Sequence, residues 1–276
     1  MRPLARMLGA VFAPGLGGQV SRFRAAQSAA TRGQAVRSVA VVGLEPGEGR
    51  STVVAVAAVA ATAFTDLSVT VLDAVAAGGP RPSVTELLGG DPQRAGLARL
   101  LPEPGEPGGP VSRAAVRAAR TPGAAVPVLG VGPADGPVTA TALRAALVRL
   151  EQRTDLVLVD TPSVASDPDL FAGVLAVVEH VVVVAGAGAD AGHRVAAVRD
   201  RIARGPAPLA NREVSVVLVD RAGPSLRRGR TDPSATVLRR AAALRDGRID
   251  RMGRGSVVDG LVVVATLLQR AGASGS

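Results

Sequence analysis

Residues 38–61, SVAVVGLEPGEGRSTVVAVAAVAA, decide the fold, because they read as a buried strand, a glycine-rich turn and a helix in direct succession. The strand is apolar almost throughout, and the helix opens with the hydroxyl residues Ser51 and Thr52. In such an arrangement, backbone N–H groups and the helix N-terminus can wrap phosphate oxygens, and glycines permit their close approach. The turn is therefore predicted to bind phosphate, the alternative being a generic glycine-rich connection between a strand and a helix.

The turn matches the P-loop motif GxxxxGK[ST] in part. Gly47, Gly49 and Ser51 fit their places, whereas Leu44 stands at the first glycine and Arg50 replaces the lysine. Arginine keeps the positive charge, but its planar fork is bulkier than an ammonium group, so the exchange is not conservative at a phosphate site. With Arg50 in this place, we expect phosphate binding to be kept and catalytic turnover to be slowed. The predicted nucleotide-binding residues of the turn are Pro46, Gly47, Glu48, Gly49, Arg50, Ser51 and Thr52.

Short valine-rich runs alternate with segments of helical spacing along most of the chain. The runs are nearly continuously apolar, as in strands buried on both faces, which predicts an α/β fold with a doubly wound, mostly parallel sheet covered by helices. The predicted strands are residues 38–43, 69–73, 126–131, 156–160, 180–185 and 214–220. The predicted helices are residues 51–64, 112–120, 139–153, 168–178, 190–204 and 256–269, and the predicted loops are 102–110 and 221–233.

The composition is that of a globular protein without thiol chemistry. Among the 276 residues, 47% are hydrophobic and 20% are charged, which excludes general disorder. No run reaches the roughly 18 uncharged apolar residues that a membrane-spanning helix needs. The absence of cysteine excludes disulfides, thiolate metal sites and a cysteine nucleophile. His180 and His193 are the only histidines, and neither is placed for a catalytic triad.

The net charge of +9 comes from 32 arginines and no lysine, which indicates a GC-rich genome more than a nucleic-acid binder. Arg227, Arg228 and Arg230 could hold DNA phosphates without sequence preference, but a solvated loop is the favoured interpretation. Aromatic residues for base stacking are scarce, at 1% of the chain.

The chain is predicted to divide into three segments. Residues 1–37 contain no acidic residue and form a basic N-terminal tail, partly disordered or helical. This tail is either solvated or in contact with a membrane surface or a partner, and the latter contacts are not favoured. Residues 38–271 form the predicted P-loop domain, and residues 272–276 a disordered tail.

Several stretches resemble one family. PGEGRST at residues 46–52 resembles the PGEGK[ST] loop of bacterial polysaccharide tyrosine kinases and the KGGxGK[ST] loop of the MinD/ParA ATPases. TDLVLVDTPS at residues 154–163 resembles the family's Walker B strand, and residues 69–89 resemble its second acidic motif. Residues 237–268 resemble the end of actinobacterial MinD-like ATPases, where a short strand leads to a closing helix. The chain has no tyrosine, which excludes tyrosine autokinase activity.

The resemblance implies a site for ATP and Mg²⁺. Asp160 would hold the metal through water together with Ser51, and Asp73 would orient the attacking water beside Arg50. Asp220 would contact the base. The alternative is that Asp73 and Asp160 merely end strands in polar loops.

The resemblance also implies a cytoplasmic protein, or one at the inner face of the membrane, that regulates a partition, positioning or secretion assembly. An unidentified protein partner and a homodimer are both open. Glu45 stands at the signature lysine, Pro46 at the first glycine of the pair and Val75 at the second polar position of the acidic motif. These departures favour the alternative of a degenerate pseudo-ATPase that serves as a scaffold or regulator.

Overall fold

The computed structural model describes residues 38–75, 82–94, 96–97, 126–131, 139–205, 214–220, 235–238, 260, 262–264 and 267. Several predicted segments lie outside these residues. They are the tails 1–37 and 272–276, the helix 112–120 and the loops 102–110 and 221–233.

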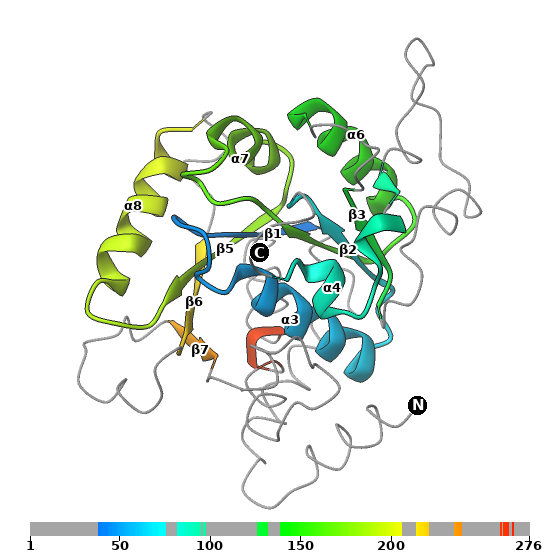
Figure 1. Ribbon diagram of the computed structural model, residues 1–276, viewed down its shortest axis with the longest axis horizontal. Coiled ribbons are helices and arrows are strands. Elements are labelled where there is room, and N and C mark those ends of the chain that lie inside the picture. Colours follow the sequence, from blue (N-terminus) through cyan, green and yellow to red (C-terminus); the bar gives the residue numbers. More distant parts are fainter. Residues whose placement is uncertain are drawn as a thin grey trace, which may run out of the picture.

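A seven-stranded sheet forms the centre of the described structure, and all of its strand pairs are parallel (Figure 1). The strand order is β3-β2-β4-β1-β5-β6-β7. The prediction of a doubly wound α/β fold is therefore confirmed. The strands are β1 Ser38–Val42, β2 Val69–Asp73, β3 Val128–Gly130, β4 Leu156–Asp160, β5 His180–Gly186, β6 Val214–Val219 and β7 Thr236–Leu238.

Helices cover both faces of the sheet (Figure 1). Because successive side chains of a strand point to opposite faces, Val39 and Val41 of β1 join one buried core while Ala40 and Val42 join the other. This double burial explains why the strands read as unbroken apolar runs. The first core lies under α3 Arg50–Phe64 and α4 Val84–Leu87, and the second under α6 Ala140–Glu151, α7 Pro168–Leu175 and α8 Ala191–Ala203.

Strand β3 is shorter than the predicted run 126–131. Pro127 has no N–H to donate, so the ladder begins after it, although its carbonyl accepts from the Val71 N–H at 2.8 Å. Within the described residues β3 lies at one edge of the sheet and pairs only with β2.

The closing helix belongs to the core. Val263, Val264 and Leu267 are buried in the same cluster as the apolar side of α3, as the apolar sequence of this segment predicts. The contact is close, because a Cβ added at Gly260 would lie 2.5 Å from Cγ1 of Val56. In the part of the chain that the structure describes, no helix combines the length and the apolarity needed to cross a bilayer.

Replacing Gly260 with alanine should lower the free energy of unfolding by about 1–3 kcal/mol, because the added methyl group overpacks the contact with Val56. Gly192→Ala is the matched control: this glycine lies in α8 and has nothing within 4 Å of an added Cβ. The control should be neutral or stabilising by up to about 1 kcal/mol. Urea unfolding measures both, and equal effects would contradict the packing of the closing helix.

Candidate functional site

The predicted site residues gather at the carboxyl edge of the sheet. Strand β1 lies between β4 and β5, and the turn after β1 leads directly into α3. The chain order reverses at this point, and ligands of open α/β sheets bind in the crevice outside such a reversal. Asp73 and Asp160 end the neighbouring strands β2 and β4 and are register partners. Asp220 directly follows β6 at the same edge.

The turn has a backbone that depends on its glycines and leads into a helix without a side-chain cap. Gly47 and Gly49 have φ values of 84° and 98°, in the left-handed region that side-chain-bearing residues rarely adopt. No side chain caps the N-terminus of α3, and its first turn carries no acidic residue. The free amides and the positive end of the helix are therefore available to an anion. Pro46 is exposed, and Gly47, Gly49, Ser51 and Thr52 are partly exposed.

The Arg50 side chain lies buried against the exit of β1. It is 8% exposed, and its Cδ lies 3.1 Å from the position a Cβ would take at Gly43. Burial lowers the pKa of Arg50, while the charges of Asp160 and Glu48 oppose that shift. Nη1 of Arg50 has no hydrogen-bond partner. Leu44 packs against the core beneath α6, α7 and α8, so its side chain is accommodated there.

Asp160 is fully buried, and neither of its carboxylate oxygens has a hydrogen-bond partner. Burial and the neighbouring charge of Asp73 raise the pKa of Asp160 to about 7. The Ser51 hydroxyl and the Arg50 guanidinium act in the opposite direction. The carboxyl group therefore lies near the start of α3, and its role as a metal ligand stays a prediction.

One buried site thus contains a donor without a partner, Nη1 of Arg50, and two acceptors without a partner, the carboxylate oxygens of Asp160. The donor and the acceptors form no hydrogen bond with each other. Orphaned polar groups of this kind are rare in folded proteins, because each costs free energy. A ligand that brings both anionic oxygens and a cation would satisfy Arg50 and Asp160 together. The oxygen donors of Asp160 and Ser51 suit a hard cation such as Mg²⁺.

Asp73 is held by the N-terminal end of α4. Its Oδ1 accepts from the Val75 N–H at 3.1 Å, and its Oδ2 accepts from the Thr85 N–H at 3.1 Å and the Thr85 hydroxyl at 2.6 Å. Burial raises the pKa of Asp73, and the bonds from Thr85 work against that shift. The carboxylate has acceptor capacity left, so its orientation of a water molecule stays a prediction.

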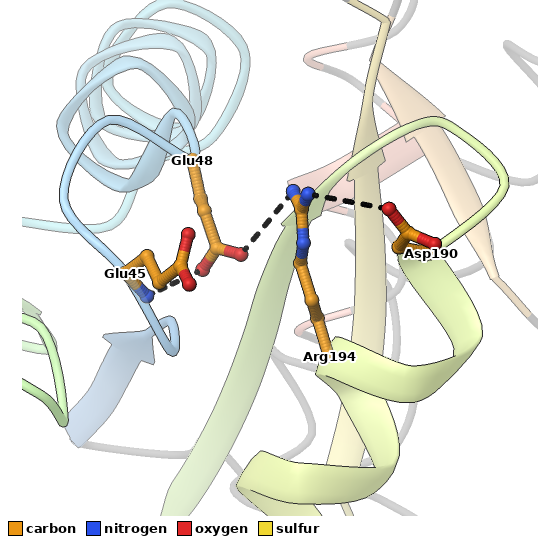
Figure 2. Close-up of polar contacts among 4 residues, drawn as sticks. All are labelled: Glu45, Glu48, Asp190 and Arg194. Carbon is orange, nitrogen blue, oxygen red and sulfur yellow. Dashed lines mark hydrogen bonds and ion pairs between the residues drawn. The ribbon is translucent and has the colours of Figure 1, made fainter.

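Glu48 lies within the turn, as Figure 2 shows. Its side chain is 2% exposed. Its Oε2 accepts from the Glu45 N–H at 3.2 Å, and its Oε1 lies 3.9 Å from Nη1 of Arg194 on α8. Burial raises the pKa of Glu48. A Cβ at Gly43 would come within 2.6 Å of Oε2, so a side chain at this position would displace the carboxylate from its place.

Hydrogen bonds connect the segment after Asp160 to the end of β1 and to the turn. The Thr161 hydroxyl donates to the Val41 carbonyl at 2.9 Å. The Val164 N–H donates to the carbonyl of Gly43 at 3.0 Å, and the next N–H donates to the carbonyl of Leu44 at 3.1 Å. A displacement of the turn would therefore be transmitted to the segment that leads into α7.

Asp220 lies beside the other end of the turn. Its N–H donates to the Leu238 carbonyl at 2.9 Å, and a Cβ at Gly49 would lie 3.0 Å from Val219. The predicted contact of Asp220 with a base stays a prediction.

Gly43, Thr85 and Arg194 were not predicted to belong to the site. Gly43 reads only as the last residue of a strand, and Thr85 as part of a helix. Arg194 lies far from the turn in sequence and stands among many other arginines, so no local pattern marks it.

Solved structures of other proteins share this fold. The ParA family ATPase from Chlorobium tepidum matches 83% of this chain and 98% of its own, with a TM-score of 0.61 at 14% identity. The chain has the ParA/MinD fold. MinD from Pyrococcus horikoshii, complexed with Mg-ADP, matches with a TM-score of 0.56 at 16% identity, over 82% of this chain and 94% of its own. The MinC:MinD complex of Aquifex aeolicus gives 0.60 at 15%, with the same coverage.

Neither protein-family models nor curated protein sequences give a match. The ParA/MinD likeness is therefore one of structure.

The raised pKa of Asp160 gives a pH-dependent stability in metal-free buffer. The pKa of this carboxyl is near 3.8 in the unfolded chain and about 7 in the folded protein. Its contribution to the free energy of unfolding is therefore complete below pH 3.8 and is lost as the pH rises through about 7. Asp160→Asn should therefore gain stability relative to the wild-type protein as the pH rises from about 5 to about 7, by an amount on the order of a few kcal/mol.

Asp155→Asn is the matched control, because hydrogen bonds from Ser68 lower the pKa of that carboxyl. The contribution of Asp155 to the free energy of unfolding is complete above the ordinary pKa of aspartate. The difference in stability between Asp155→Asn and the wild-type protein should therefore stay constant over the same pH range. Urea unfolding at several pH values measures both variants. A pH-independent difference for Asp160→Asn would contradict the burial of an ionisable, unpaired carboxyl.

Proposed function

We propose that the protein is a slow Mg-ATP-dependent switch. The observation that carries the proposal is the pair of unsatisfied groups, Nη1 of Arg50 and the two oxygens of Asp160, buried at the carboxyl end of the sheet. The phosphate oxygens of a nucleotide would accept a hydrogen bond from Arg50, and its metal ion would supply a cation to Asp160. The Pyrococcus MinD of the same fold carries Mg-ADP, which supports this choice of ligand.

The residues of the turn would have different roles in binding the nucleotide. The amides of residues 47–52 would hold the phosphate oxygens, and Arg50 would offset the charge that develops on the outer phosphate. Ser51 and Asp160 would hold the metal, Asp160 through water. When bound, Mg²⁺ would supply charge neutralisation at the phosphates.

Hydrolysis would convert ATP and water to ADP and phosphate, with Asp73 orienting the water. Two features make this step slow. The guanidinium of Arg50 has a different shape from the expected ammonium, and Asp73 is already engaged with Thr85. Slow turnover suits a switch, because the bound state then lasts long enough for a partner to respond.

The switch would act through the segment after β4. Bonds from residues 164 and 165 to the carbonyls of the turn link nucleotide binding to the start of α7. Such a link can favour one of two surface states if the nucleotide binds one of them more tightly. The Aquifex MinC:MinD complex shows that one protein of this fold assembles with a partner in cell division. We infer a partition, positioning or secretion assembly as the regulated target.

The alternative is a degenerate pseudo-ATPase that serves as a scaffold. The anchoring of Asp73 to α4 and the exposed Glu45 at the tip of the turn favour it. Such a protein would bind nucleotide without turning it over, or would not bind it.

Two measurements separate these functions: binding of Mg-ATP by calorimetry and release of phosphate. We expect binding with slow turnover for the wild-type protein. Arg50→Lys should raise turnover about tenfold or more, because an ammonium group fits the outer phosphates better. Arg201→Lys on α8 is the matched control and should change neither quantity.

Binding without turnover in both the wild-type protein and Arg50→Lys supports the scaffold. The absence of binding in both overturns the switch and leaves only the shared architecture.

A further inference from the structure

The buried Glu48 needs a counter-charge. Its side chain is 2% exposed, and Oε1 has no hydrogen-bond partner. A buried carboxylate without compensation is costly and repels other anions nearby. The charged groups that lower its pKa are Arg194 and Arg50. If Arg50 alone balanced Glu48, little of its charge would remain for a phosphate.

Arg194 supplies this counter-charge from another element of the fold. Its Nη1 lies 3.9 Å from Oε1 of Glu48, and its Nη2 lies 4.0 Å from Oδ2 of Asp190, one helical turn earlier. Figure 2 shows the guanidinium between the two carboxylates. The Asp190 side chain is 76% exposed, so that pair contributes little, whereas the Glu48 side is desolvated and its electrostatics are correspondingly stronger.

Glu48 connects Arg194 to the backbone of the turn. Its Oε2 accepts from the Glu45 N–H, so the position of this carboxylate sets the path of the residues between them. The carboxylate also lies over Gly43, beside Cδ of Arg50. The side chain of Arg194 therefore lies outside the turn and acts on it through Glu48.

We propose that Arg194 is a positioning residue of the nucleotide site: it neutralises Glu48, holds the turn through that side chain and leaves the charge of Arg50 available to phosphate. The proposal rests on the proposed function for its effect on nucleotide. The pairing of Arg194 with Glu48 is independent of any ligand.

The test is a double-mutant cycle with Arg194→Gln, Glu48→Gln and both together, measured as the dissociation constant of Mg-ATP. Arg194→Gln should weaken binding about tenfold, because Glu48 is left uncompensated beside the phosphates. The double variant should bind Mg-ATP more tightly than Arg194→Gln does, since the uncompensated charge is gone. Arg194→Lys should keep most of the affinity.

Arg201→Gln is the matched control, because it removes the same charge from the last turn of α8. It should leave the dissociation constant unchanged. A merely structural role for Arg194 would weaken binding in the single and the double variant alike, and that result would overturn the proposal. So would an unchanged affinity in Arg194→Gln.

Urea unfolding of the same four proteins without nucleotide separates this inference from the proposed function. A wild-type protein that binds no ATP overturns the proposed function, and with it the effect of Arg194 on nucleotide. The unfolding cycle then decides the pairing itself. Non-additive effects support it, and additive effects overturn it.

Discussion

The position of β1 between β4 and β5 is the constraint on which the site depends. Both neighbours are parallel to β1 and in register with it, so all three strands deliver their carboxyl ends to one edge. The chain leaves β1 through Gly43, where the absence of a side chain makes room for Glu48 and Arg50. Two glycines with positive φ then turn the backbone into α3, which presents its uncapped end to the same edge. The turn, the strand ends and the helix end are thus consequences of one pairing arrangement.

The site concentrates buried charge that the rest of the fold has to support. Asp73 and Asp160 lie side by side on neighbouring strands, and the charge of Asp73 raises the pKa of Asp160. Arg50 and Glu48 add two more buried ionisable groups. Local violations of good packing and pairing are typical of functional sites, where stability is lost so that a ligand can restore it. The two valine-rich cores on either side of the sheet supply the stability that tolerates this cost.

Sequence patterns predicted the architecture because buried parallel strands leave a strong local signal. The runs that became β1, β2, β4, β5 and β6 are apolar on both faces, and each is bounded by polar or glycine residues. Asp73 and Asp160 end two of these runs, and the resemblance to the MinD/ParA ATPases implied that they belong to one site. The pairs Glu48–Arg194 and Asp73–Thr85 could not be predicted, since they depend on how α8 and α4 pack beside the turn. The later start of β3, at Val128, was missed because Pro127 was read as part of an apolar run.

The central claim is that the backbone amides of residues 47–52 form a cup for a triphosphate, faced by the carboxylate of Asp160. Residue-resolved amide hydrogen exchange with and without Mg-ATP tests it most directly, because it reports on the amides themselves. The account predicts slowed exchange at residues 47–52 on addition of Mg-ATP, with no change on the outer face of α6 around Val148. Saturation with Mg-ATP that leaves the exchange of these six amides unaltered would contradict the account.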